Sequence, residues 1–282
     1  MSAVKITVDS TCDLSPELVE KYDITVIPLY TILGDESYAD GIDINPDGIY
    51  KFVAENNVLP KTSAASVDDY AGIFKKYTEA GMEVIHFNIS SDMSSSHQNA
   101  VIAAKEVGNV HVIDTLSLST GSGLLVLDAA DYREQGLPAA RIAELVRERV
   151  PLVRASFVLD NLEYLRMGGR CSAVAVLGAN LLKIKPRIEV KNGKMGMGGK
   201  YRGMYDKVSL KYAEDMLSLP NINTRRVFVT HTKCDEELIN QVVEKVKSLV
   251  KFDELLITTA GCVITSHCGP NTLGVLFEVK NQ

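Results

Sequence analysis

The sequence predicts an α/β fold organised as two domains, and three observations support this. Short runs of β-branched residues alternate with helical stretches through the first half of the chain, which is typical of a parallel sheet covered by helices. The 282 residues are enough for two domains that each bury a core. A hydrophobic content of 46% and a charged content of 23% are typical of a soluble globular protein.

The first half of the chain contains clear strand and helix signals. Four β-branched runs predict strands, at residues 4–8, 24–29, 84–89 and 110–113. Residues 15–22 predict a helix, because Ser15 and Pro16 occupy the cap and first-turn positions. Residues 67–80 predict a second helix, which Gly81 would end.

The pattern changes near Val150 and Pro151, so we expect residues 1–152 to form an N-terminal α/β domain and residues 153–282 a C-terminal one. In the second domain the sequence predicts strands at 155–159, 227–230, 254–259 and 273–279, and helices at 161–166, 205–217 and 235–250. The dipeptide Asn192-Gly193 predicts a hairpin within residues 187–195. The apolar segment 173–182 predicts a further helix.

Charge and hydropathy exclude several classes of partner. The net charge is −6 and no cluster of Lys and Arg occurs, which argues against a nucleic-acid surface. The N-terminus has no basic segment followed by an apolar stretch, and no window holds eighteen uninterrupted apolar residues. We therefore expect a cytoplasmic protein.

The five cysteines indicate reduced thiols, because their number is odd and none forms a C-x-x-C pair. Cys268 stands beside His267, but sequence neighbours rarely present a nucleophile and its base together. We interpret Cys268 as a packing thiol. The Cys and His spacing predicts no zinc site, and we expect neither a metal nor a cofactor.

Three hydroxyl-rich loops follow predicted strands: "DSTCD" at 9–13, "SSDMSSS" at 90–96 and "DTLSLSTGSG" at 114–123. In open α/β sheets, ligands bind beyond the carboxyl ends of the strands, where helix N-termini offer free N–H groups. Helix capping explains many such hydroxyls, but three loops exceed what capping needs. They predict a site for an anionic group. Nucleotide binding is not expected, because "GSG" matches neither a P-loop nor a dinucleotide fingerprint.

Six segments occur in one order along the chain: "VDSTCDLSPEL", "TSAAS", "ISSDMSSSHQNA", "VIDTLSLSTGSG", "LDNLEYLRMGGR" and "SHCGPNTLGV". Together they resemble the DegV family of bacterial fatty-acid-binding proteins, over nearly the whole length. The resemblance implies two α/β domains with one buried acyl chain, whose carboxylate is held by hydroxyls. It also implies a non-catalytic binding subunit, which presents the acid to the separate ATP-binding subunit of a fatty-acid kinase and carries the acyl-phosphate away.

The resemblance places the family's carboxylate contacts on Thr62 and Ser94, with Ser63 beside the first. It places His267 and Arg170 near the head group. Two departures lie beside these positions: this chain has "TSAAS" where the family commonly has Thr-Ser-Gln-Pro-Ser, and "SSSH" where it commonly has Ser-Gly-Thr-Tyr. The backbone there is expected to differ from the family's. The apolar segment 173–182 is the candidate wall of an acyl tunnel.

Two alternatives stay open at this point. One is a lipid hydrolase or acyltransferase with Ser94 as nucleophile and His267 as base, although Ser94 is not in a G-x-S-x-G elbow and no Asp is placed to orient the histidine. The other is a regulator that senses a fatty acid. The expected partners are a long-chain fatty acid and the kinase subunit, and a transient encounter with a membrane is compatible with this function. The sequence defines neither acyl length nor oligomeric state.

Overall fold

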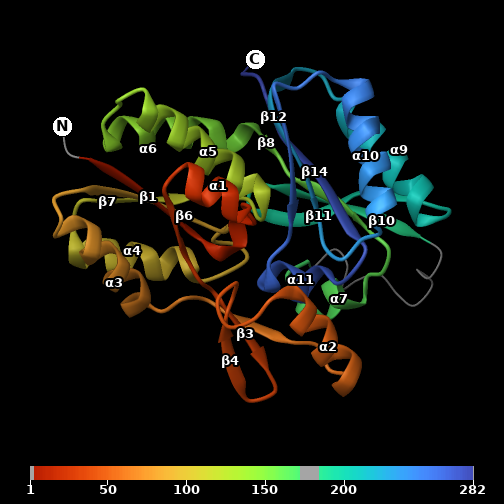
Figure 1. The fold of residues 1–282 in the computed structure, drawn as a ribbon, viewed down its shortest axis with the longest axis horizontal. Coiled ribbons are helices and arrows are strands. Elements are labelled where there is room, and N and C mark those ends of the chain that lie inside the picture. The colour runs from red at the N-terminus through yellow and green to blue at the C-terminus, as the bar shows by residue number, and fades with distance from the viewer. Residues whose placement is uncertain (1–2, 172–183, 282) are drawn as a thin grey trace.

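The computed structural model describes residues 3–171 and 184–281, and in these ranges the strands form three sheets (Figure 1). The strands of a four-stranded and a three-stranded sheet all precede residue 153, and those of a seven-stranded sheet all follow residue 152. The predicted α/β fold class, with an N-terminal parallel sheet, is confirmed. The division of the chain into domains at residue 152 stays a prediction.

The four-stranded sheet is parallel throughout and has the order β2-β1-β6-β7. Its members are β1 (Val4–Asp9), β2 (Ile24–Ile27), β6 (Glu83–Asn88) and β7 (Val110–Asp114). These are the four strands that the β-branched runs predict. Because all four run in parallel, their carboxyl ends and the hydroxyl-rich loops that follow them meet at one edge of the sheet.

Helices cover both faces of this sheet (Figure 1). On one face lie α3 (Val67–Thr78) and α4 (Ser96–Val107), whose buried side chains share a core with Ile27 and Val84. On the other face lie α5 (Thr120–Glu134) and α6 (Ala139–Arg149), with α1 (Pro16–Lys21) beside them. The hydroxyls of Ser15 and Ser66 cap α1 and α3, as is usual for serine before a helix.

A small antiparallel sheet of order β4-β3-β5 projects beside the larger ones, at the bottom of Figure 1. It consists of β3 (Tyr30–Leu33), β4 (Glu36–Ala39) and β5 (Lys61–Ser63), and α2 (Pro46–Asn56) follows β4. The sequence analysis does not predict this sheet. Its strands have only three or four residues each, so alternating hydrophobicity has little length in which to show.

The seven-stranded sheet is mixed, with the order β11-β10-β9-β14-β12-β13 and β8 paired to β14. Its strands are β8 (Val153–Arg154), β9 (Ser156–Leu159), β10 (Lys185–Lys191), β11 (Lys194–Tyr201), β12 (Ile222–His231), β13 (Glu254–Thr259) and β14 (Thr272–Val279). The predicted Asn192-Gly193 hairpin joins β10 to β11. Helices α9 (Tyr205–Leu217) and α10 (Glu236–Leu249) pack on one face, close to their predicted limits.

Helix α5 packs against both large sheets. Its residues 120–130 are all buried, and it shares a core with Ile6 and Ile85 of the parallel sheet and with Phe228 and Leu276 of the mixed sheet. The Thr120 hydroxyl lies 2.6 Å from that of Thr230 in β12. A helix buried on both sides has no amphipathic stripe, which is why sequence periodicity does not detect it. This shared helix fixes the two sheets relative to each other.

Four short helices complete the described chain: η1 (Ser10–Cys12), η2 (Val150–Leu152), α7 (Glu163–Gly168) and α11 (Cys262–Cys268). Of these, α7 and α11 lie side by side between the mixed sheet and the small sheet (Figure 1). In the described ranges no helix is both long and apolar enough to cross a membrane.

Candidate functional site

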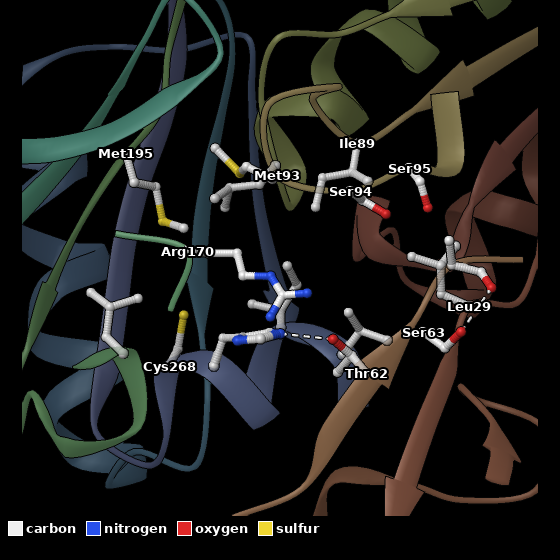
Figure 2. Close-up of a pocket in the computed structure, with 16 residues that line it drawn as sticks. Leu29, Thr62, Ser63, Ile89, Met93, Ser94, Ser95, Arg170, Met195 and Cys268 are labelled. Atoms are coloured by element: carbon white, nitrogen blue, oxygen red, sulfur yellow. Dashed lines mark hydrogen bonds between the residues drawn. The ribbon is translucent and has the colours of Figure 1, made fainter. Parts of the chain in front are cut away.

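A cavity of about 250 Å³ lies between the N-terminal loops and the α7–α11 pair. Figure 2 shows side chains that converge on it from both halves of the chain. Its polar lining consists of Thr62, Ser63, Ser94, Ser95, Arg170 and His267. Its apolar lining consists of Leu29, Ile89, Met93, Leu118, Leu165, Met195, Val263, Ile264 and Cys268, with Ala64 beside the mouth. The five candidate site residues of the sequence analysis therefore line one cavity.

The two halves of the chain meet in the cavity through one hydrogen bond. Thr62 Oγ1, on β5, lies 2.9 Å from His267 Nε2, on α11 (Figure 2). Residues 262–268 form the short helix α11, which carries His267. The helix directs the imidazole toward the small sheet, where Thr62 lies on the three-residue strand β5.

The electrostatic setting of His267 favours the neutral ring. Burial of the ring, and then the nearby charge of Arg170, lower the pKa of His267 to about 4. The Nδ1 atom is fully buried and has no hydrogen-bond partner within the described chain. At neutral pH the ring therefore carries one proton, and a buried N–H without an acceptor is rarer than an unsatisfied acceptor. We assign the proton to Nε2, which then donates to Thr62 Oγ1.

Two glycines allow α7 and α11 to approach this closely. A Cβ atom on Gly168 would lie 2.3 Å from His267 Nδ1, so a side chain at this position would displace the ring. Gly269, with φ of +70°, packs its backbone against the ring of Tyr164, and a Cβ there would lie 2.6 Å from Cδ2 of that ring. The first glycine belongs to the "GGR" motif and the second to "SHCG", so the two motifs form one packing contact.

Two aspartates from the N-terminal half hold the start of α11. The Asp40 carboxylate accepts hydrogen bonds from the backbone N–H groups of Cys262, at 2.7 Å, and Val263, at 3.4 Å. Asp13 accepts one from the N–H of Gly261, at 2.8 Å. Acceptors are favourable at a helix N-terminus, where the N–H groups are unpaired. Burial raises the pKa of Asp13 to about 8, so this side chain contributes a hydrogen bond rather than a charge. The position of His267 thus depends on residues that the sequence analysis does not single out.

Asp9 holds the start of the serine-rich loop at residues 90–96. Its carboxylate accepts hydrogen bonds from the backbone N–H of Ile89, at 3.1 Å, and from Asn88 Nδ2. The Ser90 hydroxyl reaches across to the β10–β11 hairpin and donates to the Gly193 carbonyl at 2.8 Å. Asp9 belongs to the "VDST" motif, in which only the hydroxyls point to an anion site from the sequence alone.

Ser94 has two roles in the structure. Its hydroxyl accepts a hydrogen bond from the N–H of Ser96 at 3.2 Å and lies 2.9 Å from the Ser96 hydroxyl, at the start of α4. It also lines the cavity, as does Ser95. No hydrogen bond joins Ser94 to His267 in the described chain, so the arrangement needed for a serine nucleophile and its base is not formed.

Arg170 is exposed, and its side chain extends into the pocket toward Thr62 (Figure 2). Its Nη1 donates to the Gly168 carbonyl at 2.9 Å, and within the described residues no carboxylate lies close enough for an ion pair with it. Ser63 is also exposed, and its hydroxyl donates to the Ala64 carbonyl at 3.2 Å. Most of the donors of the Arg170 guanidinium therefore remain free toward the cavity and the solvent.

The apolar side of the cavity points into the fold. Burial raises the pKa of the Cys268 thiol to about 12, so this side chain is an uncharged packing group, as the sequence analysis interprets it. A separate, largely apolar void of about 30 Å³ lies beyond Leu118, Ile264 and Cys268, which line both spaces. The predicted tunnel wall at residues 173–182 lies outside the described residues. Among the described residues no cluster of three His, Cys, Asp or Glu side chains is arranged for a metal.

The fold and this cavity together define a class of protein: an α/β protein of two large sheets, with a pocket between the two halves of the chain that has a polar mouth and an apolar interior. The chain belongs to the DegV family. The model of this family, described as an uncharacterised protein of the DegV family, matches residues 3–280.

Three similar proteins agree with this assignment. A fatty acid-binding protein of Thermotoga maritima is 34% identical over 288 residues, which cover 99% of both chains. A crystal structure of a stearic acid-binding protein from Eubacterium ventriosum is 31% identical, with a TM-score of 0.85 and coverage of 99% of both chains. The structure of a fatty-acid-binding DegV family protein from Thermus thermophilus is 29% identical, with a TM-score of 0.88 and coverage of 99% of this chain and all of the other.

Proposed function

We propose that this protein binds a long-chain fatty acid in the cavity and presents it to the ATP-binding subunit of a fatty-acid kinase, without catalytic activity of its own. The names of three similar proteins from different bacteria describe fatty-acid binding, and each of them matches this chain over nearly its full length. The cavity adds chemical support, because its polar and apolar parts are separated as in an amphipathic ligand.

The hydrogen bond between Thr62 and His267 is the observation that carries the proposal. With the proton on Nε2, His267 donates to Thr62 Oγ1, and the Thr62 hydroxyl is left to donate its own proton. A carboxylate oxygen in the mouth of the cavity is a suitable acceptor, and a hydrogen bond to a charged group contributes about 1.5–3 kcal/mol. Ser63 and Ser94 supply further donors to the head group.

Neutral donors suit a protein that must release its ligand. Hydroxyl groups, among them the Thr62 hydroxyl that the neutral imidazole supports, hold a carboxylate without the desolvation cost of a buried ion pair. Arg170, the cation at the mouth, remains outside this set and exposed. A guanidinium there suits an incoming phosphate or an acidic surface of the kinase subunit.

The acyl chain is expected to extend over Ile89, Met93 and Met195 and then toward the void beyond Leu118, Ile264 and Cys268. Methionine side chains adapt to an irregular apolar partner, because they are unbranched and polarizable. Leu118, Ile264 and Cys268 line both spaces, and rotation of these side chains would admit a chain from one to the other.

Native mass spectrometry of the freshly purified protein tests the proposal. We expect a mass increase that corresponds to one fatty acid, and methanol extraction should release that acid. Addition of ATP alone should give no acyl-phosphate, because the sequence contains no phosphate-cradling loop with its lysine. Acyl-phosphate should form when the kinase subunit is added. A protein that carries no lipid and binds none on titration would contradict the proposal.

A further inference from the structure

A second cavity, of about 640 Å³, lies on another part of the molecule, where α6 and η2 meet β8 and β10. Small-molecule sites commonly occupy 300–1,000 Å³, so this volume is sufficient for a ligand. Leu116 and Ser117 of the β7–α5 loop form one wall. Residue Leu118 of the same loop lines the first cavity, so the two spaces lie on opposite sides of one short segment.

The lining of this second cavity is basic, although the whole chain has a net charge of −6. Its charged side chains are Arg147, Arg154, Arg187, Lys191 and Glu189. Glu189 is already engaged, because it lies 2.7 Å from Lys191 Nζ and 3.8 Å from Arg187 Nη2. The single carboxylate therefore leaves an excess of positive charge.

Two of the arginines have no carboxylate partner in the described chain. Arg147 Nη2 donates to the Val112 carbonyl at 3.2 Å, and Arg154 Nη1 donates to the carbonyls of Pro151, at 2.9 Å, and Val153, at 3.1 Å. These bonds fix the direction of each guanidinium but use few of its five N–H groups. The remaining donors are available to an anion.

Two buried polar atoms in the cavity wall also have no partner. The Ser117 hydroxyl and Arg187 Nε are both inaccessible to solvent and form no hydrogen bond within the described ranges. Ser117 as a residue is only 2% exposed. Both atoms belong to residues that line this cavity, but because neither is reached by solvent, a ligand there meets the free N–H groups of Arg147 and Arg154 instead.

The rest of the lining is apolar and includes Val150, Pro151, Val153, Val190, Met216 and Leu219. From the charge, the free donors and this apolar surface we infer that the second cavity binds a small amphipathic anion, namely an organic phosphate or carboxylate with an aromatic or short aliphatic group. Arg147 and Arg154 hold the anionic group, since guanidinium geometry matches both anions. The apolar group lies against Val150 and Met216. This inference does not depend on fatty-acid binding in the first cavity.

Calorimetric titration of the intact protein with four probes tests the inference: phenyl phosphate, benzoate, phenol and inorganic phosphate. We expect phenyl phosphate or benzoate to bind at least tenfold more tightly than phenol and inorganic phosphate. Preference between the first two assigns the anion. Arg147→Ala and Arg154→Ala should each weaken the preferred probe about tenfold, and Arg154→Lys, which keeps the charge, should weaken it less. Thermal unfolding of each variant checks that it is folded.

Two further variants locate the binding. Arg141→Ala removes the same charge from an exposed position on α6 and should leave binding unchanged. Thr62→Val alters the first cavity and should also leave it unchanged. The inference is overturned if no probe binds, if inorganic phosphate binds as tightly as phenyl phosphate, or if the folded Arg147 and Arg154 variants bind like wild type. It is equally overturned if Thr62→Val abolishes binding of the probe, since the first cavity would then be its site.

Discussion

His267 Nε2 and Thr62 Oγ1 lie 2.9 Å apart, although 205 residues separate them in the sequence. The threonine belongs to the small sheet and the histidine to α11, and each is placed by contacts that do not involve the other. The pair therefore reports the relative position of two parts of the fold. Any change that moves α11 is expected to alter the donor that faces the cavity.

Gly168→Ala is expected to disturb the Thr62–His267 hydrogen bond by pushing on the Nδ1 side of the imidazole. The new Cβ atom would lie 2.3 Å from His267 Nδ1, and α11 is held by Asp13 and Asp40, so the ring must rotate away from Thr62. We expect a loss of about 1–3 kcal/mol in unfolding free energy, as for other overpacked sites, together with reduced fatty-acid retention. Chemical denaturation and lipid extraction measure the two effects.

Gly72→Ala is the matched control for this prediction. Gly72 lies in α3, and a Cβ atom there meets nothing within 4 Å. Replacement of a helical glycine by alanine should stabilise the protein slightly. Wild-type lipid content in a folded Gly168→Ala protein would show that the close approach of α7 does not position the histidine.

The low pKa of His267 predicts a specific dependence of stability on pH. The pKa is about 4 in the folded protein and near 6.5 when the ring is in water. Between pH 4 and 6.5 the unfolded chain binds more protons than the folded protein does. The contribution of His267 to the free energy of unfolding is therefore complete above pH 6.5, and acidification from pH 6.5 to 4 should remove up to about 3 kcal/mol of it. His267→Asn should lack this component. Equal pH profiles for the two proteins in that window would contradict the assignment of a buried neutral ring.

Part of the fold could be predicted from the sequence, and the failures have physical causes. The strands of the parallel sheet were predicted because each is a short β-branched run. Helix α11 was not, since "CVITSHC" is rich in β-branched residues that favour strands. Its helical form depends on Asp13 and Asp40, which supply N-terminal acceptors from more than 200 residues away. Local propensity contains no information about such a contact.

The candidate site shows the same division. Motifs located Thr62, Ser94, Arg170 and His267, and all four line one cavity. The residues that position these side chains, Asp13, Asp40 and Gly168, could not be predicted from the sequence. Their roles depend on partners far away in the chain, and no local sequence pattern identifies such a partner. Gly168 is an example: its role depends on a ring from α11.

Arg170→Ala is expected to separate lipid binding from lipid transfer. The side chain is exposed and bonded only to the Gly168 carbonyl in the described chain, so its loss should preserve the fold and most of the bound fatty acid. Acyl-phosphate formation with the kinase subunit should slow at least tenfold, because a fixed cation near the incoming phosphate is removed. Coupled turnover and copurified lipid are measured on the same preparation.

Arg141→Ala provides the comparison, since it removes an equal charge from an exposed position on α6, a helix that does not line the first cavity. It should support normal turnover. Normal turnover in Arg170→Ala as well would assign Arg170 to local structure. Loss of lipid from a folded Arg170→Ala protein would instead make the arginine a direct carboxylate contact.

Ile264→Phe is expected to shorten the acyl chain that the protein accepts. Ile264 lines both the cavity and the void beyond it, and a larger ring there would close the passage between them. Mass spectrometry of extracted lipids should show a shift toward shorter acids. Ile102→Phe, at a residue 39% exposed on α4, should leave the lipid profile unchanged. An unaltered profile in folded Ile264→Phe would place the tail elsewhere.

The most direct test of the central claim compares Thr62→Val with Thr62→Ser, by measuring bound fatty acid per mole of freshly purified, folded protein and its dissociation constant on titration. Valine keeps the shape of threonine but removes the hydroxyl that lies against His267 and that we propose binds the carboxylate, whereas serine keeps it. We predict at least tenfold weaker binding in Thr62→Val, equivalent to about 1.4 kcal/mol or more, and near wild-type binding in Thr62→Ser. Undiminished lipid content and affinity in Thr62→Val would contradict the claim that this hydroxyl holds the head group.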